Sequence, residues 1–219
     1  MRWETHCHTV YSNRAPRRFD ALNTPRQLIE TAIKKGLGGI IITDHDTVAG
    51  GLVGERISRN YGNFKVIPGA EITSSSGHIL AIGIRFNVPK GLSVEETVDK
   101  IHDLGGIAVA SHPFAGGRRP SLREECLKAD GVEVFNANNR YDANHNALLL
   151  AKAHQSRMTA GSDAHWARNL GYAGIICDDP MEDIRRGHTK IFGNYTSLLV
   201  RRVFVLRQLA SALVRRPLP

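Results

Sequence analysis

Histidine and carboxylate side chains recur where apolar runs of this sequence begin or end. One such residue is usually a buried or rim side chain, but a metal cluster needs several nitrogen and oxygen donors from distant parts of a chain. Asn13, in a loop, is a further candidate. The six segments are His6-Cys7-His8, Asp44-His45-Asp46, Glu71, His78, His112 and Asp163-Ala164-His165. Their joint recurrence predicts a multinuclear metal hydrolase.

The segments differ in what they could bind. His6 and His8 alternate along a strand-like stretch, so both imidazoles face one side and could share a divalent ion, at roughly 2.0–2.1 Å for zinc. His45 follows the apolar Ile40–Ile42 and is a better ligand candidate than its flanking aspartates, since Asp46 or Thr47 could cap the next helix. The Glu71 carboxylate could bridge two ions, which a single imidazole nitrogen cannot.

Short apolar runs alternate with amphipathic stretches, which favours strands followed by helices. With continuous apolar strands, this pattern predicts a parallel sheet buried on both faces, and parallel strands in a barrel bring their carboxyl ends to one face. Caps support the helices: Thr24-Pro25 and Ser93 begin two of them, and Gly36 and Gly105 end them. The expected strands are Trp3–His8, Gly39–Thr43, Lys65–Gly69, Ile79–Ile84, Ile107–Ser111, Gly131–Phe135, Met158–Ala160 and Ala173–Cys177. The expected helices are Pro25–Lys35, Val48–Asn60, Val94–Leu104, Ser121–Lys128, Ala143–Gln155, Met181–Arg186 and Leu198–Val214.

The net charge of +8 lies entirely in the C-terminal segment. No acidic residue follows Asp183, whereas eight of the 29 basic residues do, and the remaining 21 balance the 21 acidic residues. This excess could attract nucleic acid or another anionic surface, or it could be a solvated helix. The apolar positions Leu199, Val203 and Leu206 share a face of Leu198–Val214, which we expect to pack on the barrel. The alternative is a basic helix lying on a membrane surface.

The length, composition and cysteine content of the chain limit the class of protein to which it can belong. A chain of 219 residues with 42% hydrophobic and 23% charged residues suits one large globular domain, expected over residues 1–190, with a C-terminal basic helix in 191–219. No apolar run approaches the ~20 residues of a membrane span, so none is expected. Three scattered cysteines without CxxC spacing indicate a reduced, cytoplasmic protein.

The motifs, in order, resemble those of the PHP (polymerase and histidinol phosphatase) superfamily. These are His-x-His, Thr-Asp-His-Asp-Thr, Gly-Ala-Glu, Gly-His, Ser-His-Pro and Gly-Ser-Asp-Ala-His, over about residues 1–190. The resemblance implies an α/β fold, a distorted seven-stranded, TIM-like (β/α) barrel. It also implies two to three divalent ions (manganese, iron or zinc) at the strands' carboxyl ends, and phosphoester hydrolysis.

The resemblance also implies a division of the donors among three ions. Glu71 would serve two of them. The first ion would be held by His6, His8, Glu71 and Asp163, the second by Glu71, His78 and His112, and the third by Asn13, His45 and His165. Asn13 departs from the family pattern, since many relatives carry aspartate or histidine there and an asparagine offers only a neutral carbonyl oxygen.

The expected mechanism is attack on phosphorus by a hydroxide that bridges the ions, which also neutralise the phosphate oxygens. Glu71, Asp163 and His165 are the expected catalytic residues, with His165 or a water protonating the leaving group. Arg14 and Arg140 are the preferred phosphate-binding cations. The expected partner is a phosphorylated small molecule or nucleotide, and no cap domain is expected over the mouth.

Two other functions fit parts of the sequence. One is a non-catalytic nucleic-acid-binding subunit on the same barrel, which the basic tail favours and the persistence of the donors opposes. The other is an amidohydrolase-like deaminase, which the motif order and the lack of a lysine among the ligands oppose. Both alternatives share the barrel, so the site decides between them.

Overall fold

Nine strands form one sheet in the part of the chain that the structure describes. The computed structural model describes residues 1–13, 19–116 and 120–214, with side chains as far as residue 210. The sheet order is β7-β6-β5-β4-β3-β2-β1-β8-β9. The strands are β1 (Arg2–Cys7), β2 (Gly39–Ile42), β3 (Lys65–Thr73), β4 (His78–Ile82), β5 (Ile107–Ala110), β6 (Gly131–Asn136), β7 (Arg157–Gly161), β8 (Ala173–Ile176) and β9 (Lys190–Gly193).

The first seven strands curl into a barrel because β7 returns to the carboxyl half of β1. Thr5 Oγ1 donates to the Ala160 carbonyl at 2.6 Å. Beyond β7, the His8 amide donates to the Ala164 carbonyl at 3.0 Å, and Cys7 and Ala164 form a parallel bridge. The amino half of β1 instead pairs with β8, which carries β9 at the sheet edge. The predicted distorted barrel is confirmed, and β8 and β9 bring the strand count to nine.

Strand β4 runs against its neighbours, which corrects the expectation of a parallel sheet. It pairs antiparallel with both β3 and β5, and β8 and β9 are antiparallel additions as well. The reversal follows from a tight connection: Thr73 at the end of β3 lies opposite His78 at the start of β4. The first residue of β4 therefore lies at the barrel end where its neighbours finish.

The helices around the barrel begin and end largely as their caps predict. Capping boxes at Thr24 and Ser93 start α1 (Pro25–Lys34) and α3 (Val94–Asp103), and Gly36 and Gly105 follow these helices with positive φ. The predicted helix at 121–128 is a short 3₁₀ segment, Arg123–Lys128. The other helices of the barrel are α2 (Ala49–Ser58), α4 (Tyr141–Ala153) and α5 (Pro180–Arg186).

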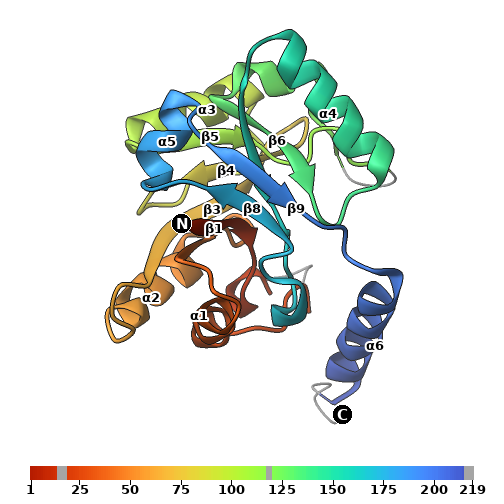
Figure 1. Cartoon of the computed structure of the whole chain (residues 1–219). Helices are drawn as coiled ribbons and strands as arrows, with labels where there is room; N and C mark the ends of the chain where they lie inside the picture. Colours follow the sequence, from red (N-terminus) through yellow and green to blue (C-terminus); the bar gives the residue numbers. More distant parts are fainter. Residues whose placement is uncertain (14–18, 117–119, 215–219) are drawn as a thin grey trace.

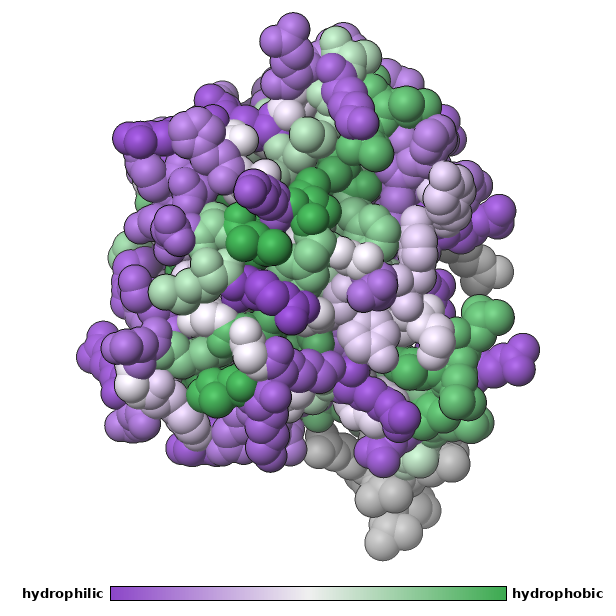
Figure 2. Space-filling view, in the orientation of Figure 1, coloured by the Kyte–Doolittle hydropathy of each residue, from purple (hydrophilic) through white to green (hydrophobic). Residues whose placement is uncertain are grey.

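Helix α6 (Leu198–Val214) projects beyond the barrel at the C-terminal end of the chain (Figure 1). The apolar face expected to pack is the wrong one: Leu199 and Leu206 are 68% and 64% exposed. The inward face instead carries Val200, Phe204 and Gln208, spaced four residues apart. Apolar side chains consequently cover the outer surface of this helix (Figure 2). Among the described residues, no helix combines the length and apolar character needed to cross a membrane.

Candidate metal centre

His6 and His8 lie at the barrel's carboxyl end with their ring nitrogens side by side. Both are fully buried, and their Nε2 atoms are 3.1 Å apart. Asp163 Oδ1 lies 3.5 Å from His6 Nε2 and 3.3 Å from His8 Nε2. Glu71 Oε2 is 3.5 Å from each of these nitrogens. The structure thus brings together the four donors predicted for the first ion.

The two carboxylate oxygens of Glu71 face different groups of imidazoles. Oε1 lies 3.0 Å from His78 Nδ1 and 2.9 Å from His112 Nε2. Oε2 lies toward the His6–His8 pair and 3.1 Å from His45 Nδ1. His78 reaches this position because β4 is reversed. One buried carboxylate between two sets of nitrogens has the arrangement needed to bridge two cations.

A third set of donors surrounds an aspartate that the sequence analysis did not select. Asp20 Oδ2 lies 3.4 Å from His45 Nε2 and 3.2 Å from His165 Nε2. With His8, these residues form a group whose ligand atoms all lie within 4.8 Å of one another. Asp20 follows no apolar run, but it is the only acidic residue between Glu4 and Glu30 in a basic stretch. That isolation is the sequence signal that could have identified it.

Asn13 is engaged elsewhere, which corrects its predicted place beside the third ion. Its Oδ1 accepts from the Ala21 amide and its Nδ2 donates to the Ala21 carbonyl, both at 2.8 Å. Both ends of the side-chain amide are therefore used by the backbone. Asn13 fixes the residue that follows Asp20, and Asp20 presents the carboxylate.

Some buried atoms in the centre lack the hydrogen bonds that burial normally demands. Asp20 Oδ2 and His45 Nδ1 have no hydrogen-bond partner, although each lies within 3.4 Å of an oppositely polar side-chain atom. Leaving such groups unsatisfied costs roughly 1–3 kcal/mol each, and a coordinated cation would satisfy them. Histidine nitrogens and carboxylate oxygens suit divalent manganese, iron and zinc. The residues therefore fit the ions that the sequence predicts.

Polar residues behind the histidines fix which ring nitrogen faces the centre. Glu133 Oε1 lies 2.9 Å from His6 Nδ1, and Ser12 Oγ lies 3.2 Å from His8 Nδ1. Ser12 Oγ in turn donates to Asp44 Oδ1 at 2.8 Å. With Nδ1 as donor in both rings, each Nε2 presents its lone pair to the shared site. Sequence patterns did not reveal this contact of Glu133, because the residue lies inside an apolar strand.

Asp46, His112 and Asp163 adopt positive φ angles of 53°, 29° and 52°. Such backbone is uncommon outside glycine and concentrates at functional sites. Asp46 does not cap a helix as expected: its carboxylate accepts from the Thr73 amide at 2.7 Å and ties the loop after β2 to the end of β3. Local strain at this barrel end accompanies the convergence of the donors.

Comparisons with known proteins identify the family of the chain. Residues 142–188 match a family described as PHP-associated. Over 157 residues the chain is 37% identical to the uncharacterized protein MJ1587 of Methanocaldococcus jannaschii, covering 68% of this chain and 90% of that one. The chain belongs to the PHP superfamily. A second uncharacterized protein of that organism, MJ0417, is 29% identical over 184 residues, 80% of this chain and 70% of its own.

Solved structures share the PHP fold at low identity. A candidate metal-dependent phosphoesterase from Bifidobacterium adolescentis gives a TM-score of 0.62 at 22% identity, covering 94% of this chain and 96% of that one. An amidohydrolase from Chromobacterium violaceum with bound sulfate gives 0.64 at 17%, covering 88% and 98%. PsfC from Pseudomonas syringae gives 0.64 at 16%, covering 98% of each chain. At these identities the likenesses show a shared fold.

The PHP centre of this chain brings charged groups of opposite sign into contact. Burial would raise the pKa of Glu71, yet the surrounding imidazoles, with His78 foremost, hold that pKa well below its usual range. Burial would likewise lower the pKa of His6, but the facing carboxylates of Glu133 and Asp163 raise it well above the ordinary value. The contacts between these imidazoles and carboxylates therefore favour the charged form of both His6 and Glu71.

The two histidines beside Asp20 have pKa values shifted in opposite directions. Asp20 outweighs the effect of burial and raises the pKa of His165 to about 9, whereas burial lowers the pKa of His45 to about 2. The neighbouring carboxylates thus favour a proton on each of His6 and His165. Cations entering the centre must displace these protons, so metal binding releases protons.

The predicted phosphate-binding arginines are not brought into the centre by the described contacts. Arg140 immediately precedes α4, its side chain is 81% exposed, and its Nε lies 3.2 Å from Asp142 Oδ1. Arg14 lies outside the described residues. Their role in substrate binding stays a prediction.

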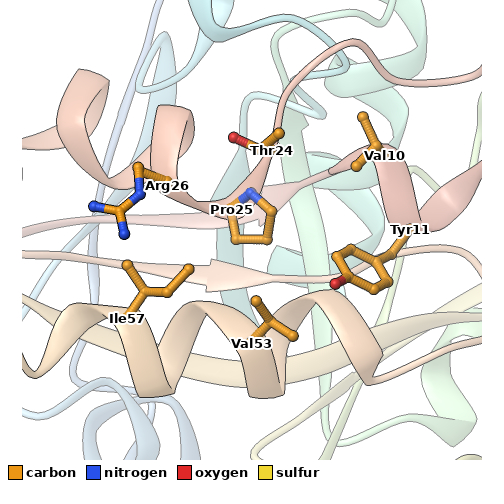
Figure 3. Close-up of a pocket in the computed structure, with 7 residues that line it drawn as sticks. All are labelled: Val10, Tyr11, Thr24, Pro25, Arg26, Val53 and Ile57. Atoms are coloured by element: carbon orange, nitrogen blue, oxygen red, sulfur yellow. The ribbon is translucent and has the colours of Figure 1, made fainter.

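A separate hollow of about 450 Å³ lies between α1 and α2. The side chains of Val53 and Ile57 rise from α2 toward Pro25, and Tyr11 closes one side (Figure 3). Its lining includes no histidine or carboxylate: it consists of Val10, Tyr11, Thr24, Pro25, Arg26, Val53 and Ile57. The hollow therefore offers none of the donor types of the metal centre.

Proposed function

We propose that this chain is a metal-dependent phosphoesterase that hydrolyses a phosphomonoester or a nucleotide or nucleic-acid phosphoester. The observation that carries the proposal is the position of Glu71, with one oxygen toward His78 and His112 and the other toward His6 and His8. Divalent ions in such adjacent sets would supply a lowered pKa for the attacking water and positive charge for the phosphate oxygens.

The residues of the chain have distinct tasks in this reaction. Glu71 holds the two halves of the centre in a fixed relation. Asp163 Oδ1 lies beside both His6 and His8 and also 3.4 Å from His165 Nδ1, so it orients donors on both sides of the site. Burial of these groups excludes water that would otherwise screen their charges.

His165 is placed for either of two roles. Its Nδ1 lies 3.0 Å from the Asp163 carbonyl, which leaves Nε2, beside Asp20, as the atom that acts. Nε2 can hold a cation or donate a proton to the leaving oxygen, but it cannot do both at once. A third ion and a histidine acid are therefore alternatives at this residue. Arg14 and Arg140 are proposed to attract the anionic substrate.

A second candidate is a non-catalytic nucleic-acid-binding protein. The observation in its favour is the cationic C-terminal segment, with exposed Arg202 and Arg207 and no acidic residue after Asp183. Against it stands the convergence of eight strand-end donors, which binding alone does not require. Phosphoester hydrolysis is the better explanation of the buried centre.

The test is hydrolysis of p-nitrophenyl phosphate and bis-p-nitrophenyl phosphate with added Mn²⁺, alongside elemental analysis of the purified protein. We expect manganese-stimulated hydrolysis that is lost in His8→Ala and Asp163→Ala. The exposed His188 supplies a matched control, since His188→Ala removes an imidazole far from the donors in sequence and should keep wild-type activity. Bound metal with equal activity in all variants would place the reaction elsewhere. Absence of bound metal from the wild type would contradict the enzyme proposal and favour the binding protein.

A further inference from the structure

Helix α6 contacts two of the three loops that carry the donors of the third set, those of Asp20 and His165. Gln208 Nε2 donates to the carbonyl oxygens of Phe19 and Asp20, at 2.8 and 3.1 Å. One turn earlier, the Phe204 ring lies 6.2 Å from the His165 ring, centroid to centroid. The Arg207 guanidinium lies 4.9 Å from the ring centroid of Trp166, the residue after His165.

Asp20 needs such support because it is not carried by a strand. It lies in the connection between β1 and α1, whereas the donors of the other two sets lie in strands or directly after them. The segment after it is tied down by the Asn13–Ala21 pair and by the Leu22 amide, which donates to the His165 carbonyl at 3.0 Å. At Phe19 and Asp20 themselves, the two bonds from Gln208 hold the main chain.

The two hydrogens of the Gln208 amide fix two consecutive carbonyl groups, and this sets the direction of the Asp20 peptide. The Asp20 carboxylate then lies 3.4 and 3.2 Å from the nitrogens of His45 and His165. Phe204 covers His165 on the same side. The inward face of α6 therefore touches the third set and leaves the outward leucines free.

We propose that α6 is a positioning element of the metal centre, and that Gln208 holds Asp20 in place so that the third cation can bind. The inference rests on the proposed metal-dependent function and deepens it. Gln208 acts through Asp20 and contacts no cation itself. The first and second sets, built from barrel strands, do not depend on α6.

The experiment measures the number and affinity of Mn²⁺ ions in the full chain, by elemental analysis after desalting and by chelator competition. Gln208→Ala is expected to weaken one ion about 10-fold or more, as loss of an outer partner commonly does, and to leave the tighter ions unchanged. Asp20→Asn should weaken the same ion, and the double variant should be no worse than Asp20→Asn alone. Leu209→Ala is the matched control, because Leu209 adjoins Gln208 and is 57% exposed.

The outcomes separate the inference from the function beneath it. Wild-type affinity for every ion in Gln208→Ala, with one ion weakened in Asp20→Asn, would overturn the role of α6 and leave the metal enzyme intact. Equal loss in Leu209→Ala would also overturn it, since the helix would then act through its general stability. Absence of bound ions from the wild type would overturn the inference together with the proposed function.

Discussion

Glu133 offers the sharpest test of how this centre is built, because one substitution should change the proton position on a metal-binding histidine. Glu133 is 1% exposed, and its Oε1 lies 2.9 Å from His6 Nδ1. Its Oε2 accepts two hydrogen bonds, from the His112 amide at 2.8 Å and from Asn136 Nδ2 at 3.0 Å. In Glu133→Gln the side chain keeps its shape, but one oxygen becomes an NH₂ group.

The orientation of the new amide follows from the two donors on one side. If the NH₂ group faced the His112 amide and Asn136 Nδ2, hydrogen-bond donors would face donors. Each buried group left without a partner would cost roughly 1–3 kcal/mol. Asn136 cannot simply rotate, because its Oδ1 already accepts from the Asn138 amide at 2.9 Å. The amide oxygen therefore stays with these donors, and the NH₂ group faces His6 Nδ1.

His6 must then accept at Nδ1, so its proton moves to Nε2, the nitrogen that faces His8 and Asp163. A protonated Nε2 has no lone pair for a cation. Loss of a carboxylate behind a metal-binding histidine typically weakens metal binding about 10–100-fold, or about 1.4–2.7 kcal/mol. We expect Glu133→Gln to lose Mn²⁺ affinity by this factor and to lose hydrolysis in parallel at limiting metal.

The assay is competition for Mn²⁺ with a chromophoric chelator, with thermal unfolding of the metal-free protein as the check on folding. Glu124→Gln is the control, since Glu124 is an exposed carboxylate. The His6→Ala/Glu133→Gln pair should bind no worse than His6→Ala alone. If Glu133→Gln folds normally and binds Mn²⁺ with wild-type affinity, the tautomer argument is refuted.

Three further outcomes are expected. Glu4→Gln should lower the free energy of unfolding by about 1–3 kcal/mol in urea denaturation. Both carboxylate oxygens of buried Glu4 accept hydrogen bonds, from donors on His6, Ser162 and Gly171, and the NH₂ group of glutamine would face one of these donors. An unchanged urea midpoint would contradict this prediction. Chelation should lower Tm by about 5–10 °C, since a ligand at about 100 times its Kd stabilises by ~2.7 kcal/mol and each kcal/mol shifts a domain of this size by about 2–4 °C. Iodoacetamide at pH 8 should label the three buried thiols only after unfolding, since burial raises the pKa of Cys177 to about 12; rapid labelling of the folded protein would show that a thiol is accessible.

Apolar runs and helix-capping residues predicted strands and helices well, because these elements are determined mainly by neighbouring residues in the sequence. The apolar Ile40–Ile42 forms a fully buried strand, and the capping boxes at Thr24 and Ser93 start their helices as expected. His78 was identified although β4 is antiparallel to its neighbours, because the prediction used its position at the border of an apolar run and not the direction of the strand. Strand direction could not be read from the apolar run, since a buried strand has the same pattern in either direction.

Features that depend on tertiary contacts were not predictable in this way. The face of α6 that packs was misassigned because apolar periodicity points to Leu199 and Leu206, whereas contacts with the barrel use Val200 and Gln208. Asp20 was missed because its loop carries no periodic signal. Glu133 was missed because a carboxylate inside an apolar strand is informative only once its partner, a histidine far away in sequence, is known.

The three donor sets therefore differ in what holds them. Donors on strands are fixed by the hydrogen-bonded ladder of the barrel, and sites on regular elements are more accurately placed than sites on loops. Glu71 lies opposite Leu80 in the β3–β4 ladder and its carboxylate contacts His78 on β4, so we expect the first two sets to persist as long as the barrel is folded. The third set draws its carboxylate from a connection held by Asn13 on one side and by α6 on the other. On the proposed role of α6, cation binding at the third set depends on the C-terminal helix, whereas the first two sets depend on the barrel.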